Sequence, residues 1–305
     1  MASSEIADNV CMSYYNNEQV AKLYRDVPTE QRDMLLQFRA DHPLRKRTHG
    51  GVEWHYIDTK HGESVLLLLT GALGAAESSW DTILRFEPRI RVISPAYPAV
   101  STMAELIDGI VMILEQEKID NVHVLGGSYG GYVAQVFVRR HPHKVKSLVI
   151  SHAGIPDVKR GVRISKTLRW LPLLPMKLLR MLFERSMSGL LPEEGSDTQL
   201  HIAFFKEVIR YQLTKDRLIS SFRRIVDFDS NYVFSADDLR EWDGVVLLVM
   251  ADDDPGTPEP VRSAMQNLYP GARVKMFSGN GHAAPLLRSG EYHASIREFI
   301  DDYEA

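Results

Sequence analysis

Short aliphatic runs alternate with amphipathic segments along most of the chain. Residues 65–69, 122–125, 145–150 and 245–250 are mainly apolar, which is typical of strands buried on both faces of a parallel sheet. Residues 103–114 instead repeat apolar side chains every three or four positions, which predicts an amphipathic helix. This alternation predicts an α/β protein with a mostly parallel central sheet that helices cover on both faces.

Weaker patterns add the remaining elements of the sheet. Residues 52–57 alternate apolar and polar side chains, as a half-exposed strand does. Residues 90–93 and 273–277 predict two further short strands. Helices are expected near residues 260–268 and from about Glu291 onward.

Two regions lack strand patterns altogether. Residues 18–38 have helical spacing that Pro28 interrupts, and they predict a helical lead-in packed on the main domain. Residues 156–242 show helical patterns only, and we expect them to form a cap over the carboxyl ends of the strands, where ligands bind in open α/β sheets. The predicted organisation is a lead-in at 1–50, the first part of the core at 51–155, the cap at 156–242 and the second part of the core at 243–305.

Composition narrows the class of protein. Hydrophobic residues make up 44% of the 305 positions and charged residues 25%, which are ordinary globular values. The net charge of −4 gives no reason to expect a nucleic acid partner. Cys11 is the single cysteine, and neither a signal peptide nor an apolar run long enough to span a membrane is present, so we expect a cytoplasmic protein without disulfides. Metal-ligand spacings are missing, and no metal or cofactor is expected.

The most informative motif lies between one predicted strand and the next helix. Gly126-Gly127-Ser128-Tyr129-Gly130 follows an apolar run and precedes a helical pattern that starts near Gly131. This is the pattern of a nucleophile elbow, in which a serine occupies a strand-to-helix turn too sharp for bulky neighbours. Ser128 is therefore the candidate nucleophile.

A serine hydroxyl needs a general base, and that base needs an orienting acid. His282 follows the predicted last strand and is the candidate base. Asp252, Asp253 and Asp254 follow the preceding strand, and because three adjacent carboxylates cannot all be buried, we expect one of them, Asp254, to point inward. A fully solvated acidic turn and a divalent metal site are the alternatives for this cluster.

An oxyanion formed at the serine would need two N–H donors. The backbone N–H of Tyr129, directly after the serine, is the first candidate. The loop Thr70-Gly71-Ala72-Leu73-Gly74 follows a buried strand and offers the second, with Ala72 preferred over Leu73 and Gly71 expected at the substrate. A plain glycine-containing turn is the alternative for this loop.

These motifs together resemble the capped members of the α/β-hydrolase superfamily, from about Val52 to the C-terminus. The resemblance implies the triad Ser128, Asp254 and His282 and the fold that carries it. Many members have His-Gly where this chain has Thr70-Gly71, and many have Asp-x-Pro-Gly where it has Ser-Pro-Ala-Tyr-Pro at 94–98.

The second departure has a counterpart in one branch of the superfamily. Tyr97-Pro98, with Leu-Thr-Lys-Asp-Arg-Leu-Ile at 213–219, is similar to the maspardin branch. An adaptor or binding role has been proposed for that branch, which makes a non-catalytic binding protein an alternative to an enzyme. Members that resemble haloalkane dehalogenases and epoxide hydrolases carry an aspartate nucleophile, so Ser128 disfavours those reactions.

The predicted cap is rich in basic and apolar side chains. Residues 159–185 contain eight Lys and Arg residues and one acidic residue, Glu184. Such a segment suits an anionic membrane surface or a phosphate-bearing acyl carrier. The alternative, which we favour at this stage, is a cap whose apolar face lines an acyl pocket while its basic face is solvated. On that interpretation Trp170 and His152 are expected at the substrate.

The sequence thus predicts a serine hydrolase that cleaves an ester, thioester or lactone of a mainly apolar small-molecule acyl substrate through an acyl-enzyme. Hydrolysis of a carbon–carbon bond is a related alternative. A binding protein without catalysis and an interfacial lipid-binding protein are alternatives from other functional classes.

Overall fold

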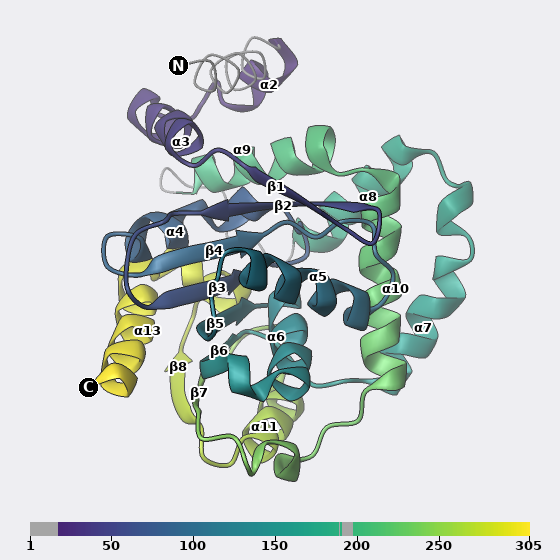
Figure 1. Cartoon of the computed structure of the whole chain (residues 1–305). Coiled ribbons are helices and arrows are strands. Elements are labelled where there is room, and N and C mark those ends of the chain that lie inside the picture. Colours follow the sequence, from purple (N-terminus) through teal and green to yellow (C-terminus); the bar gives the residue numbers. More distant parts are fainter. Residues whose placement is uncertain (1–17, 189, 191–197) are drawn as a thin grey trace.

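An eight-stranded sheet forms the centre of the computed structural model, which describes residues 18–188, 190 and 198–305 (Figure 1). The strand order is β1-β2-β4-β3-β5-β6-β7-β8. β2 pairs antiparallel with both β1 and β4, and every other neighbouring pair is parallel. The strands are β1 (Arg45–His49), β2 (Val52–Asp58), β3 (Val65–Leu69), β4 (Arg91–Pro95), β5 (Val122–Gly127), β6 (Val145–Ser151), β7 (Val245–Ala251) and β8 (Arg273–Phe277).

Helices cover both faces of the sheet, as predicted. The helices α5 (Met103–Gln116), α6 (Tyr129–Arg140) and α11 (Glu259–Leu268) contribute to one apolar cluster. The helices α3 (Thr29–Asp41), α4 (Trp80–Phe86) and α13 (Ser289–Glu304) contribute to a second apolar cluster. Alternate residues of the central strands divide between the two clusters, so the mostly parallel, doubly covered sheet is confirmed.

One strand lies where only a helical lead-in was expected. β1 pairs along its whole length with β2 at the edge of the sheet. Its sequence, Arg-Lys-Arg-Thr-His, has no apolar alternation because this edge faces water and acidic partners. Arg47 donates to Glu117 at 2.9 Å, and charged side chains are a common means of keeping an edge strand from pairing with other chains. The lead-in is therefore helical only up to Asp41.

Between β6 and β7 the chain forms helices, and among the described residues of this segment no strand occurs. The cap helices are α7 (Val158–Leu168), α8 (Met176–Ser188), α9 (Gln199–Glu207) and α10 (Lys215–Asn231). α8 packs on the π-helical turn after α9 and on α10 through a small apolar cluster, which includes Phe183, Ile209 and Leu218. None of the described helices is both long and apolar enough to cross a bilayer.

The lead-in and the cap meet at a buried carboxylate. The side chain of Glu207 is fully buried at the end of α9. It accepts hydrogen bonds from Tyr24, next to α2 (Glu18–Leu23), and from Arg39 on α3. The N-terminal helices thereby fix one end of the cap.

Candidate active site

Ser128 lies on a strained turn between β5 and α6. Its backbone has φ 52° and ψ −119°, a conformation that residues other than glycine rarely adopt. A Cβ on Gly126 would lie 2.3 Å from the carbonyl oxygen of Gly130, and a Cβ on Gly130 would lie 2.0 Å from that of Leu69. These two glycines let the helix approach the strand closely enough to present the serine hydroxyl above the sheet.

His282 and Asp254 form the partner pair that the sequence predicted for this serine. His282 Nδ1 lies 2.9 Å from Asp254 Oδ2, and because a carboxylate only accepts, the imidazole donates from Nδ1. Its Nε2 is then left as the acceptor that a general base requires. Among the hydrogen bonds of the described residues, none joins Ser128 Oγ to His282. Such bonds are often long in hydrolases without substrate and shorten when substrate binds.

Asp254 is held as a buried anion. Its side chain is fully buried, and it also accepts from the Thr257 hydroxyl at 2.8 Å and from the Gly256 N–H at 2.7 Å. Burial alone would raise the pKa of Asp254, but the hydrogen bond and charge of His282, with the Thr257 and Gly256 bonds, outweigh it and lower the pKa. The carboxylate therefore stays ionised and stabilises a positive charge on His282.

The two neighbouring carboxylates have structural partners instead. Asp252 accepts from the Ser278 hydroxyl at 2.6 Å, and Asp253 accepts from the Gly281 N–H at 2.9 Å. Both are exposed. Asp252 and Asp253 thus bind the segment that carries His282, whereas Asp254 binds the imidazole itself. No cluster of side chains that could hold a metal ion occurs among the residues that the structure describes.

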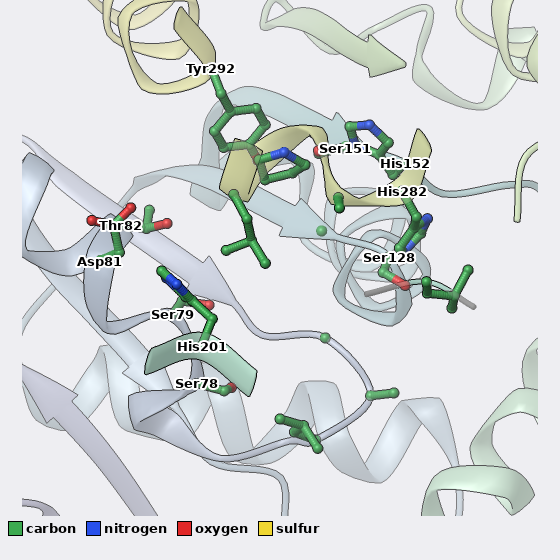
Figure 2. A pocket seen from close by; sticks show the side chains of 18 of the residues that line it. Ser78, Ser79, Asp81, Thr82, Ser128, Ser151, His152, His201, His282 and Tyr292 are labelled. Atoms are coloured by element: carbon green, nitrogen blue, oxygen red, sulfur yellow. Dashed lines mark hydrogen bonds between the residues drawn. The ribbon is translucent and has the colours of Figure 1, made fainter. Parts of the chain in front are cut away.

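A pocket of about 260 Å³ joins the elbow to the cap. Ser128, His282 and His152 line one end of it (Figure 2). His201 and Asp81, with neighbouring serine and threonine side chains, line the other end. The wall between them is mainly apolar and includes Leu69, Leu73, Leu125, Met187, Leu190, Phe205 and Leu286.

The predicted oxyanion donors come from two segments that adjoin this pocket, the loop after β3 and the start of α6. Gly71, Ala72 and Leu73 line the pocket, and Tyr129 begins α6 directly after Ser128. Among the described residues, no turn, cap or loop hydrogen bond uses the N–H of Tyr129 or of Ala72. Both donors are therefore available to an oxygen bound above Ser128.

Arg217, on cap helix α10, fixes the loop that carries Ala72. Its Nη2 donates to the carbonyl of Gly74 at 2.7 Å and its Nε to the carbonyl of Tyr97 at 3.2 Å. Tyr97 binds the same loop from the core, through its N–H to Gly74 and its hydroxyl to the Thr70 carbonyl at 3.0 Å. The two segments that depart from the common superfamily pattern, Thr70-Gly71 and residues 94–98, are thus in direct contact.

Arg224, two turns further along α10, reaches the other donor. It is almost fully buried, and its Nε donates to the Tyr129 hydroxyl at 2.6 Å. Its Nη1 donates to the carbonyls of Pro98 and Val100. Neither Arg217 nor Arg224 was predicted from the sequence as a site residue. The available signal was the pair of segments noted for their similarity to the maspardin branch, Tyr97-Pro98 and residues 213–219, the second of which contains Arg217.

His152 follows the end of β6 and packs against His282. Its side chain is 4% exposed, and its ring lies 5.6 Å from the ring of His282. Burial, with the nearby charge of His282, lowers the pKa of His152 to about 4, so the ring is neutral. Nδ1 is hydrogen-bonded to the Ser151 hydroxyl, whereas Nε2 is buried without a partner among the described residues. A polar atom of a substrate can occupy that position.

The structure does not bring Trp170 to the pocket. Its side chain is 60% exposed on the outer side of the cap, in the turn after α7. Each cap helix has an inner and an outer side, and its apolar residues divide between the two. Met187, Leu190 and Phe205 supply the apolar cap wall of the pocket in its place.

Known proteins support the same fold. A model of the α/β hydrolase fold matches residues 87–289. Maspardin of Danio rerio is 25% identical over 235 residues, which cover 76% of this chain and 72% of that protein. A 2-hydroxy-6-oxononadienedioate/2-hydroxy-6-oxononatrienedioate hydrolase of Paraburkholderia xenovorans is 23% identical over 278 residues, or 84% of this chain and 93% of that protein.

Among solved structures, a hydrolase from Pseudomonas aeruginosa is similar with a TM-score of 0.70 at 17% identity, over 85% of this chain and 98% of that one. The resemblance to capped hydrolases and to maspardin that the motifs indicated is thereby confirmed. The chain belongs to the α/β hydrolase fold family.

Proposed function

We propose that the protein is a serine hydrolase that cleaves an ester, thioester or lactone of a mainly apolar acyl substrate. The observation that carries this proposal is the 2.9 Å bond between His282 and the buried Asp254, at the end of the pocket that Ser128 also lines. A histidine oriented in this way can take the proton of a serine hydroxyl. The pocket supplies a small apolar chamber for the acyl group.

The reaction proceeds in two halves. Ser128 Oγ attacks the carbonyl carbon and its proton passes to His282 Nε2, while the carbonyl oxygen becomes an oxyanion held by the N–H groups of Tyr129 and Ala72. His282 then protonates the leaving group, and the acyl-enzyme remains on Ser128. Water, deprotonated by His282, releases the acid by the same steps in reverse order.

Hydrolysis of a carbon–carbon bond is the second candidate. The Paraburkholderia relative is named a hydrolase of 2-hydroxy-6-oxononadienedioate, a substrate whose name contains no ester. Its similarity covers most of both chains. The far end of the pocket adds support, since His201 Nε2 is buried there with no hydrogen-bond partner among the described residues and would suit a second polar group on the substrate. A non-catalytic binding role, as proposed for the maspardin branch, is the alternative from another class.

Labelling with a fluorophosphonate probe tests the proposal. We expect rapid labelling of the wild-type chain, none in Ser128→Ala and little in His282→Ala. Asp254→Asn should lower ester turnover by roughly 10³- to 10⁴-fold. Ser79→Ala is the matched control, because Ser79 lines the same pocket away from the elbow.

The small chamber predicts faster turnover of short acyl esters than of long ones. If the folded wild-type chain is neither labelled nor active on an ester series, the serine hydrolase proposal is wrong and a binding role takes its place. Turnover of 2-hydroxy-6-oxononadienedioate with little ester hydrolysis would favour the second candidate.

A further inference from the structure

The outer side of the cap has an unusual combination of exposed side chains. Apolar residues are exposed along α7, the following turn and α8, with Leu173 at 72% and Trp170 at 60%. Basic residues lie among them. We call this the outer cap surface; its apolar members are Val158, Val162, Trp170, Leu173, Met181 and Leu182, and its basic members are Lys159, Arg163, Lys166, Arg169 and Lys177.

The orientation of α7 is fixed by contacts with α10, so the members of the surface on α7 must face outward. Arg160 forms a two-pronged ion pair with the buried Asp229, with distances of 2.8 and 2.6 Å. Gly161 lies so close that a Cβ would come within 2.8 Å of the Asp229 Cβ. Val162, Arg163 and Lys166 lie on the side of the helix away from this contact and are exposed. Figure 1 shows α10 between α7 and the sheet.

The basic side chains of this surface are not paired with acidic side chains in the part of the chain that the structure describes. In the described part of the chain, none of the five basic side chains of the outer cap surface forms an ion pair. The acidic residue of the segment, Glu184, accepts instead from Arg210 at 2.9 Å. A positive surface on a chain of net charge −4 concentrates attraction for anions on one side of the molecule.

We propose that the outer cap surface binds an anionic lipid bilayer. Exposed tryptophan and aliphatic side chains interleaved with Lys and Arg match the two parts of such an interface, the acyl boundary and the anionic headgroups. Each basic residue near an anionic membrane contributes about 1 kcal/mol, or about fivefold in partitioning. The surface is formed by the outward sides of helices, which suits a deformable bilayer better than the compact contact of an acyl carrier protein.

The same surface is close to the pocket. On its inner side, α8 buries Leu179 and Phe183 against Phe205, which lines the pocket, and Met187 near the end of α8 lines it directly. A bilayer bound to the cap would therefore lie one helix away from the acyl chamber. The binding itself does not depend on the proposed catalysis, so each can fail without the other.

Sedimentation with lipid vesicles tests this inference on the full chain carrying Ser128→Ala. We expect binding to vesicles that contain phosphatidylserine, at least tenfold weaker binding to pure phosphatidylcholine, and release as salt rises from about 0.1 to 0.5 M. Arg163→Glu with Lys166→Glu should weaken binding at least tenfold. The matched control is Arg89→Glu with Arg240→Glu, two exposed arginines outside the surface, which should change it less than threefold.

Tryptophan emission gives an independent readout. Trp170 is exposed, whereas Trp54 and Trp80 are buried, so anionic vesicles should shift emission to the blue and Trp170→Phe should abolish most of the shift. Leu173→Ser should weaken binding, and Leu44→Ser, at an exposed leucine elsewhere, should not. Equal binding to neutral and anionic vesicles, no effect of the cap substitutions, or binding only to an acyl carrier protein or a second copy of the chain would overturn the inference.

Discussion

Arg224 Nε donates to the hydroxyl of Tyr129 at 2.6 Å, so a buried arginine of the cap holds the residue next to Ser128. The backbone N–H of Tyr129 is one of the two proposed oxyanion donors. Displacing its side chain would therefore move a donor whose position decides how well the oxyanion is stabilised. The contact connects the cap with the chemistry at Ser128.

Arg224→Met should lower kcat about tenfold with little change in KM, because a misplaced donor weakens stabilisation mainly in the transition state. Ester kinetics measure both constants. Arg223→Met, at an exposed neighbour on the same helix, is the control. Arg224→Lys should recover part of the lost kcat, and a folded methionine variant with wild-type kcat would show that Tyr129 needs no such support.

Arg217→Met should also lower kcat, by about tenfold, through the other donor. It removes the side-chain donors to the Gly74 and Tyr97 carbonyls and loosens the loop that carries Ala72. The rate of fluorophosphonate labelling should fall in parallel with kcat. An unchanged labelling rate would contradict a role for Arg217 in positioning the oxyanion loop.

His152→Asn should raise KM about fivefold for esters with a polar group near the carbonyl and less for purely apolar esters. The reason is the buried Nε2, which offers a neutral hydrogen bond worth about 1 kcal/mol to a polar substrate atom. Asparagine tolerates the backbone φ of 50° at this position. Equal KM changes for both kinds of ester would indicate that His152 only fills space.

The free energy of unfolding should fall as pH drops from about 6.5 to 4. Burial lowers the pKa of His293 to about 4, although its bond to the Ser289 carbonyl opposes this shift. In that pH range the unfolded chain binds a proton that the folded chain does not, which costs up to about 3 kcal/mol per such histidine. Above the unfolded pKa both states are neutral, and this pH dependence disappears.

Urea unfolding at a series of pH values measures this loss. His293→Gln should be less stable at neutral pH but should flatten the decline between pH 6.5 and 4. The exposed His61 provides a control, since His61→Gln should leave the slope unchanged. An equally steep decline in His293→Gln would assign the acid sensitivity to other groups.

The sequence predicted the strands that carry apolar side chains, both the fully buried residues 65–69 and the largely exposed residues 273–277. Residues 65–69 lie in the middle of the sheet, so both sides of that strand had to be apolar and the run was visible. β1 could not be recognised, because an edge strand held by Arg47 and its neighbours to acidic partners looks like a polar loop. A pattern of apolar residues reveals buried positions, and the residues of β1 are exposed or only partly buried.

The residues of the candidate site also divide into those that the sequence reveals and those that depend on packing. Ser128 and His282 could be placed because the elbow has a local steric signature and the order of the triad along the chain is fixed. Arg223 and Arg224 are adjacent in sequence, yet only the packing of α10 decides that one is exposed and the other buried. Trp170 was misplaced for a related reason, since apolar character does not say whether a residue of the cap faces the pocket or the solvent.

The two arginines of α10 also limit how the cap can be exchanged. In a protein whose cap only covers the pocket, recombination could replace the cap with that of a relative and change substrate preference alone. Here Arg217 and Arg224 bind backbone and side-chain atoms of the core beside both proposed oxyanion donors. A transplanted cap without these arginines would leave the proposed oxyanion donors without this support, so cap and core are expected to be inherited together.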